Sequence, residues 1–182
     1  MANKTAQITS SPTSVRLEST WKCYGSPDSN GYYQNQTTPT IATSTVTFDI
    51  SSIPKSAKIS TAYIHAEWSS PAYGFNTRQI NGTSVTTNGN LNVTISASEL
   101  SNGSVSATFK FQSGTRALQN IDTHSGATTV SNIYLYIEYT ASSTIYLGGS
   151  GSLVGYKLYH AENGALVQYS LYHGENGSLV KY

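Results

Sequence analysis

Two His-x-Glu triplets, at residues 160–162 and 173–175, are the most regular pairing of potential metal-binding side chains in the sequence. Imidazole and carboxylate groups together ligate many transition metals. Both triplets fall where hairpin turns are predicted, and they recur with the 13-residue period of a repeat. Duplication of the repeat explains the recurrence, so we expect solvated turn residues and no metal site.

Side chains that could support hydrolysis are scattered along the chain. His65 and Glu67 alternate on one predicted strand, and His124 follows Asp122 in a predicted loop. Neither pair comes with the Ser-His-Asp order or the G-x-S-x-G elbow of serine hydrolases. Glycosidases need two carboxyl groups on facing elements, and the candidates here are Asp49, Glu67, Glu99, Asp122 and Glu138. None has an informative context. We therefore predict no catalytic residues, no cofactor and no enzymatic activity; polysaccharide hydrolysis through Glu67 or Asp49 is the least favoured alternative.

The composition favours exposed antiparallel sheet. Only 10% of the 182 residues are charged, whereas 14 are tyrosine. The formal net charge of +1 lacks the basic surplus of nucleic-acid-binding proteins, so no nucleic-acid partner is expected.

The first residues show no signal peptide, and no run approaches the roughly 18 apolar residues of a membrane span. We expect synthesis in the cytoplasm, no membrane contact, and a buried structural thiol at Cys23, the single cysteine.

Residues 1–141 predict an antiparallel β-sandwich. In residues 61–68, alanine, isoleucine and tryptophan alternate with tyrosine, histidine and glutamate, as in a half-buried strand. The same period occurs at 91–95, 105–111 and 133–139. Asn-Gly dipeptides, which favour hairpin turns, stand between such runs at 81–82, 88–89 and 102–103. Many short strands with turn signals between them are typical of a sandwich.

A family resemblance supports this architecture. Residues 47–62, TFDISSIPKSAKISTA, resemble the FDLSSIP-xGAxIxxA signature of DNRLRE-type jelly-roll modules. In that signature Phe48 and Ile50 correspond to core positions, Pro54 ends one strand, and Ile59 begins the next. Residues 130–139 also resemble the I-x-L-x-I-x-Y end of sandwich domains in phage tail and fibre proteins. The resemblance implies a jelly-roll-like sandwich, and such modules serve as adhesins, carbohydrate binders or stalk spacers.

The C-terminal segment 142–182 contains three 13-residue units, 143–155, 156–168 and 169–181, that align without gaps. Turns are predicted at 148–151, 161–164 and 174–177, which gives a meander of β-hairpins with strands such as 152–160 and 165–173. About 40 residues cannot bury two partly apolar faces alone, so we expect self-association. A trimeric shaft is the first expectation, and a meander docked on the sandwich is the second. The residues assigned to oligomerisation are Val154, Tyr156, Leu158, Val167, Tyr169, Leu171 and Tyr182.

This segment resembles the short vYlGstxvxkvYlGstxvY repeats at the ends of many bacteriophage virion proteins, most closely at 145–148 and 152–154. With the sandwich signature, the resemblance implies a non-catalytic phage structural or surface protein located in the virion: a tail, fibre or capsid-decoration component. The implied partners are copies of itself, other virion proteins and host cell-surface polysaccharide. Such contact would be multivalent.

Aromatic side chains of the first 141 residues are candidates for stacking on sugar rings. Residues 23–40 form a long predicted loop, a common carrier of binding residues. The opposing interpretation is that the loop tyrosines pack on the sandwich and that Trp68 faces the core. A monomeric carbohydrate-binding module is therefore the alternative function. Its ligand-binding residues would be Tyr24, Tyr32, Tyr33, Trp68 and Tyr73.

Overall fold

The alternating stretches of the sequence form strands in the computed structural model. The described residues are 3–55, 57–86, 89–100 and 103–141, together with the backbone of six strands in the C-terminal segment. All strand pairs among them are antiparallel. The predicted all-β, antiparallel, sandwich-like fold is therefore confirmed.

Six strands make the first sheet: β1 (Asn3–Thr9), β2 (Val15–Pro27), β3 (Tyr33–Gln36), β5 (Lys58–Trp68), β8 (Gly89–Thr94) and β10 (Thr123–Thr140). β10 is central, with β5 along one edge and β8 beyond β5. Along the other edge, β1 pairs with residues 134–140 and β2 with residues 123–130. Two strands thus follow one another along a single edge of β10, separated by the loop of residues 10–14.

The second sheet has four strands: β4 (Ala42–Asp49), β6 (Phe75–Ile80), β7 (Thr83–Ser84) and β9 (Ser104–Ser113). Their order is β4-β9-β6-β7. The one helical element among the described residues is the 3-10 turn η1 (Ala97–Leu100), which begins where Ser96 donates its N–H to the Glu99 carboxylate at 2.8 Å. None of the described helical structure has the length and apolar character needed to cross a membrane.

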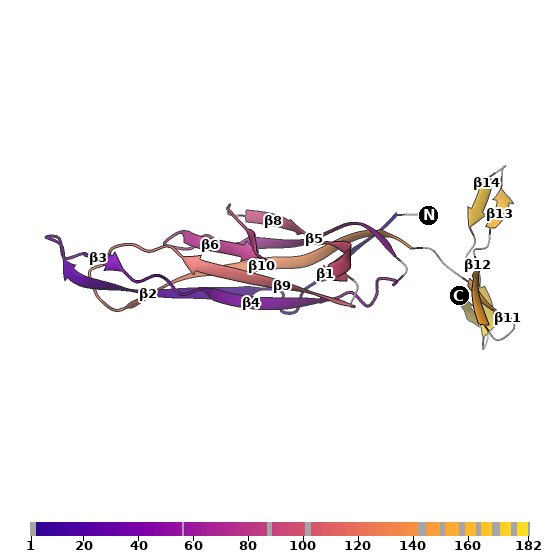
Figure 1. The fold of residues 1–182 in the computed structure, drawn as a ribbon, viewed down its shortest axis with the longest axis horizontal. Coiled ribbons are helices and arrows are strands. Elements are labelled where there is room, and N and C mark those ends of the chain that lie inside the picture. The colour runs from indigo at the N-terminus through magenta and orange to yellow at the C-terminus, as the bar shows by residue number, and fades with distance from the viewer. Residues whose placement is uncertain are drawn as a thin grey trace.

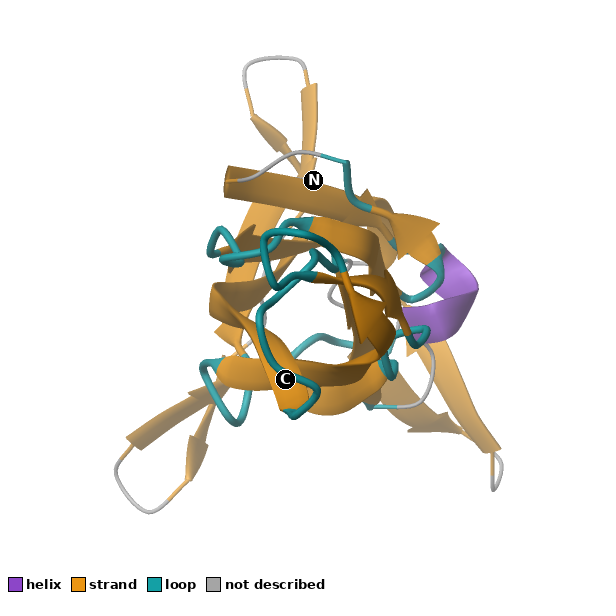
Figure 2. Cartoon of the chain, turned by 90° about the vertical axis from the view of Figure 1, so that its left-hand side faces the viewer, coloured by secondary structure: helices purple, strands orange, loops and turns teal. Residues whose placement is uncertain are grey.

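The apolar faces of the two sheets meet in one core, around which the sheets curl as a half-barrel (Figure 2). Residues 47–62 carry the chain from β4 in the second sheet to β5 in the first. Phe48 and Ile50 are buried there, as the sequence predicts, and Pro54 lies in the turn between the strands. Cys23 is also buried as a free thiol, as predicted.

The two ends of the sandwich differ (Figure 1). At one end, here called the base, Thr140 pairs with both Asn3 and Lys58, so the chain enters β1 and leaves β10 at the same place. At the other end, the tip (residues 24–33), β2 turns back into β3. The 18 residues of β10 connect the two ends. At the usual rise of a strand they span about 55 Å.

The described strands of the C-terminal segment form three hairpins, each a separate two-stranded sheet. They are β11 (Ile145–Gly149) with β12 (Ser152–Tyr156), β13 (Tyr159–Glu162) with β14 (Ala165–Gln168), and β15 (Tyr172–Glu175) with β16 (Ser178–Lys181). The first two residues of each predicted turn, at 148–149, 161–162 and 174–175, are paired within strands, and the remaining turn residues lie outside the described residues. The connections at 157–158 and 169–171 lie outside the described residues, so the continuous meander stays a prediction.

Candidate functional site

The tip carries three of the five predicted ligand-binding residues on one hairpin. Tyr24 is 52% exposed and Tyr32 is 39% exposed, whereas Tyr33 is half-buried. Tyr24 pairs with Asn35 across the hairpin, and Tyr33 pairs with Pro27. The predicted loop is therefore mostly a hairpin, which fixes the backbone positions of its tyrosines.

A single carboxylate organises the turn of the tip. Asp28 Oδ1 accepts the backbone N–H groups of Asn30 and Tyr32, both at 2.9 Å, and Oδ2 accepts the side-chain amide of Gln34 at 2.7 Å. Gly31 has a φ of 83°. Glycine adopts this left-handed conformation without steric cost because it has no Cβ. The hydrogen bond from Tyr32 lowers the pKa of Asp28 below its ordinary 3.8; desolvation opposes this shift, and the hydrogen bonds from Asn30 and Gln34 add to it.

Tyr73 and Trp68 lie elsewhere and pack inward. The Tyr73 ring meets the buried Trp21 edge-on, with centroids 5.1 Å apart, and the Arg116 guanidinium carbon lies 4.7 Å from the Tyr73 centroid. Trp68 is only 4% exposed because it follows the inward face of β5, and its ring packs against Phe109. The assignment of Trp68 to an exposed ligand site is therefore corrected to a core position.

Sequence reasoning missed a buried arginine beside this tryptophan. Arg78 is 2% exposed, and its guanidinium carbon lies 4.2 Å from the Phe75 ring centroid and 5.5 Å from that of Trp68. Its Nη2 donates to the Ser69 carbonyl at 2.6 Å, and burial lowers the pKa of Arg78. The alternation at residues 75–80 places residue 78 on the inward face. The side chain thus serves the core, where its cation stacks on aromatic rings.

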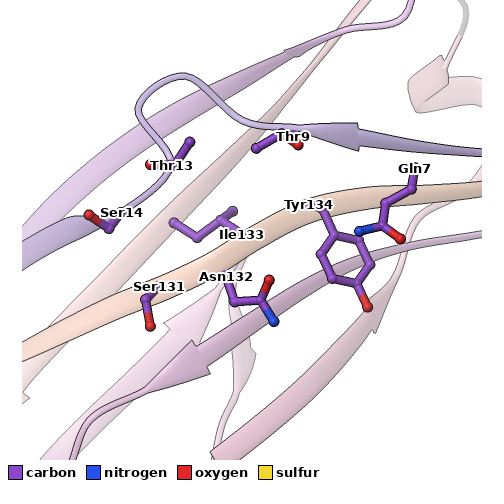
Figure 3. A pocket seen from close by; sticks show the side chains of 8 residues that line it. All are labelled: Gln7, Thr9, Thr13, Ser14, Ser131, Asn132, Ile133 and Tyr134. Atoms are coloured by element: carbon purple, nitrogen blue, oxygen red, sulfur yellow. The ribbon is translucent and has the colours of Figure 1, made fainter.

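A hollow of about 280 Å³, here called the bulge cleft, opens where β1 ends and β2 begins (Figure 3). The loop of residues 10–14 leaves the first sheet at this point, because Ser11 donates its N–H to Thr47 of β4 at 3.3 Å. The eight residues that line the bulge cleft come from β1, from the loop and from β10: Gln7, Thr9, Thr13, Ser14, Ser131, Asn132, Ile133 and Tyr134.

A β-bulge in β10 forms the floor of this cleft. The pairing of β10 with β5 shifts between Ser131 and Tyr134, and Asn132 adopts a φ of 48°. The bulge changes which residues face the core: Val130 points inward before it and Ile133 after it. Asn132 is turned out to solvent. Bulges with a residue in the left-handed region often lie beside functional sites, because they redirect side chains.

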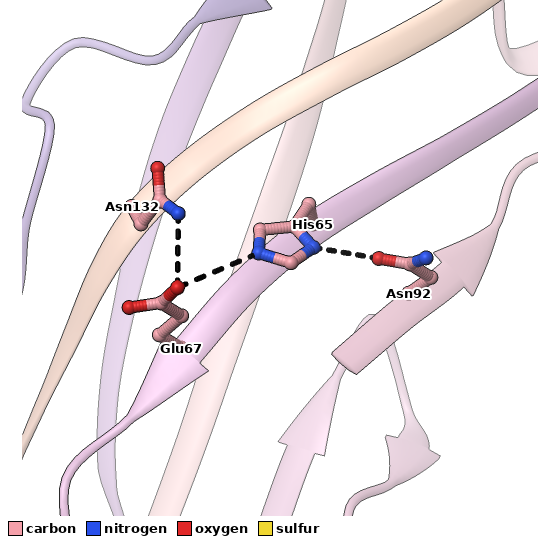
Figure 4. A network of polar contacts seen from close by, with 4 residues as sticks. All are labelled: His65, Glu67, Asn92 and Asn132. Carbon is pink, nitrogen blue, oxygen red and sulfur yellow. Dashed lines mark hydrogen bonds and ion pairs between the residues drawn. The ribbon is translucent and has the colours of Figure 1, made fainter. Parts of the chain in front are cut away.

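Four side chains beside the bulge form one polar network on the outer face of the sheet (Figure 4). Asn132 Nδ2 donates to Glu67 Oε1 at 3.0 Å, and the same oxygen lies 4.0 Å from His65 Nε2. On its other side, His65 Nδ1 lies 2.7 Å from the amide oxygen of Asn92. His65 is 6% exposed although it lies on the outer face.

Stacked aromatic rings cover the histidine and continue toward the base. The Tyr134 ring lies 4.5 Å from that of His65 at an angle of 15°, and Tyr136 stacks on Tyr63 at 4.8 Å. Each is a cross-strand pair between β10 and β5. Burial, with smaller contributions from Tyr63 and Glu67, raises the pKa of Tyr134. Its phenol therefore stays protonated and able to donate at neutral pH.

No family model matches the chain, and no curated protein or solved structure matches it either. Within the described part of the chain, no three His, Cys, Asp or Glu side chains gather as a metal site. The bulge cleft offers hydroxyl, amide and phenol groups, which suit hydrogen bonding to a neutral ligand.

The base holds a second and larger hollow of about 620 Å³. It lies between the β4–β5 turn and η1, and its walls are mainly apolar, with Lys55 and Lys58 among them. We call it the base hollow. It adjoins the point where β10 ends, since Lys58 pairs with Thr140.

The residues predicted to mediate oligomerisation lie in the C-terminal hairpins only in part. Val154 and Tyr156 lie on β12, and Val167 lies on β14. The other four lie outside the described residues: Leu158, Tyr169, Leu171 and Tyr182.

Proposed function

We propose that the chain is a non-catalytic structural and surface protein of a bacteriophage particle. It would assemble through its base and C-terminal segment and contact a cell surface with its tip. The observation that carries this proposal is that the two ends of the sandwich differ. Both Asn3 and Thr140 lie at the base, while Tyr24 and Tyr32 are exposed at the opposite end. A tail, fibre or capsid-decoration component needs this separation of attachment from contact.

The base hollow supports attachment at this end. Ile53, Pro54 and Leu100 contribute apolar surface to it, and two lysines stand beside them. Exposed apolar surface rimmed by polar residues favours burial against another protein. A neighbouring virion protein is the partner that this proposal assigns to the base.

The repeat supports assembly of several copies. An isolated two-stranded hairpin is marginally stable in water, and each described hairpin of the C-terminal segment pairs only with itself. Repeats that cannot bury their own faces gain stability by stacking on neighbours. Three chains joined through residues 142–182 would present three tips, and individually weak contacts would then reinforce one another.

Light scattering on the full chain and on a chain ending at Ala141 tests the assembly. We expect the full chain to be a trimer and the shortened chain to be a monomer, because the repeats supply the interface. An unchanged number of copies after truncation would contradict the proposal.

The exposed tyrosines of the tip favour a second candidate, a monomeric carbohydrate-binding module. A panel of bacterial surface polysaccharides, presented to both chains, separates the two functions. Saturable binding that survives truncation and is lost in the Tyr24→Ala/Tyr32→Ala variant would favour the module. Binding that requires the repeats would favour the multivalent virion protein. Ile41→Ala is the control, since it removes an exposed apolar side chain outside the tip.

A further inference from the structure

We propose that the bulge cleft is a binding site for one neutral sugar residue, separate from the tip. This inference does not depend on whether the protein belongs to a virus particle. Its basis is the juxtaposition of an interrupted strand pair, a left-handed asparagine and a stacked tyrosine around one hollow.

The cleft is held open by hydrogen bonds on the side of the loop. Ser10 donates its N–H to the Ile133 carbonyl at 3.3 Å, and its hydroxyl donates to the Pro12 carbonyl at 2.6 Å. Ser11 is tied to Thr47 of the second sheet. These contacts anchor the loop wall, so less backbone freedom is lost there when a ligand binds, which reduces the entropic cost of binding.

The chemistry of the walls selects a neutral, hydroxylated ligand. None of the eight lining side chains carries a charge. Thr9 and Thr13 supply hydroxyl groups, while Gln7 supplies an amide, and all three are exposed. Hydroxyl and amide groups both donate and accept hydrogen bonds, as the hydroxyls of a sugar require of their partners. The volume of about 280 Å³ lies near the lower limit of small-molecule sites, which run from about 300 Å³ upward.

Asn132 is placed to bind through its amide. Glu67 accepts one Nδ2–H, and among the described residues no group donates to the amide oxygen. The carboxylate thus fixes the amide while its oxygen remains able to accept a sugar hydroxyl. Glu67 acts here as a positioning residue, held in turn beside His65.

Tyr134 supplies the apolar surface that a sugar ring requires. One face of its ring stacks on His65 of β5. The other side of β10 is occupied by β1, where Thr9 pairs with Tyr134 and Gln7 lies beside the ring (Figure 3). The ring thus stands between the histidine and the cleft, and aromatic rings of this kind pack against the C–H faces of sugars.

Isothermal titration and ¹H-¹⁵N NMR of the full chain, with glucose, galactose, mannose and N-acetylglucosamine, test the site. We expect saturable shifts for at least one neutral sugar, centred on residues 7–14 and 131–134. Glucuronate tests the selectivity for neutral ligands, and we expect it to bind at least fivefold more weakly. Absence of binding by all four neutral sugars would overturn the proposal, as would tighter binding of glucuronate.

Asn132→Gly is the decisive variant, because glycine accepts the φ of 48° while the amide is lost. We expect roughly five- to tenfold weaker binding, as for loss of one or two neutral hydrogen bonds. Asn81→Gly is the matched control, since Asn81 also has a φ of 48° but lies in the turn after β6. Unchanged affinity in Asn132→Gly, or an equal loss in Asn81→Gly, would refute the assignment.

The tip provides the second control. Tyr24→Ala/Tyr32→Ala removes the exposed aromatic rings of the tip, so it tests whether the sugar binds there instead of in the bulge cleft. If the tip variant abolishes sugar binding and Asn132→Gly does not, the sugar site is the tip and the proposal for the bulge cleft is wrong.

Discussion

Asp28 shows how one exposed side chain can order a binding surface. Three donors converge on its carboxylate, and two of them are backbone N–H groups of the turn that carries Tyr32. The aromatic residues of the tip thus depend on the ionised state of a neighbour that has no ligand role of its own.

We therefore predict a pH-dependent loosening of the tip in acid. The pKa of Asp28 is lower in the folded chain than its ordinary 3.8, chiefly because of the Tyr32 N–H. Its contribution to folding is complete above the unfolded pKa and is lost as the pH falls through the folded pKa. NMR titration of the Asp28 carboxyl carbon should give a midpoint below 3.8. Gln34→Ala should move it upward; a midpoint of 3.8 or more in the wild type would contradict the prediction.

Single residues were predictable from the sequence where alternation or composition governs them. The alternation in β5 places Trp68 inside, which is why its assignment to a ligand site fails although that of Tyr24 to an exposed position holds. His65 and Glu67 were recognised only as possible catalytic residues. Their link to Asn92 and Asn132 joins three strands and depends on pairing that no local pattern encodes.

At the scale of elements, the two-residue period of the sequence predicts the strands but not the bulge in β10. A signal for it exists: the polar pair Ser131-Asn132 interrupts the alternation between Val130 and Ile133. One extra residue at that point keeps both flanking apolar residues in the core. The break between β1 and β2 is different, because it depends on the attachment of Ser11 to β4.

The two sheets approach each other closely where β10 crosses β9. A methyl group added at Gly126 would lie 2.7 Å from Ser113 Cβ and 3.5 Å from Trp21 Cζ3. Its nearest neighbour would be Ser113 Oγ, and Ser113 is itself buried, so the serine side chain would have to shift.

We predict that Gly126→Ala lowers the free energy of unfolding by about 1–3 kcal/mol, as overpacking of a core does. Urea unfolding followed by tryptophan fluorescence measures this directly, because both tryptophans lie in the sandwich core. Adding Ser113→Gly should restore part of the loss by removing the atoms that the new methyl group meets. A change smaller than about 0.5 kcal/mol would show that the sheets separate readily.

On the scale of the whole molecule, the sandwich should fold without the C-terminal segment. Its core is formed by residues between Val15 and Ile137, and both of its sheets end by Thr140. We predict that a chain ending at Ala141 keeps the fluorescence spectrum of the full chain and a single cooperative thermal transition. Exposed tryptophans or a gradual transition in the shortened chain would mean that the repeats complete the core.

The course of β10 has a mechanical consequence. Eight residue pairs, from Thr123 with Lys22 to Val130 with Val15, join it to β2, and further pairs join it to β5 and β1. A pull applied between the tip and Thr140 would run along this strand, so those hydrogen bonds would bear the load in shear and together, not one after another. The sandwich is thus suited to act as a tether that withstands tension along its length.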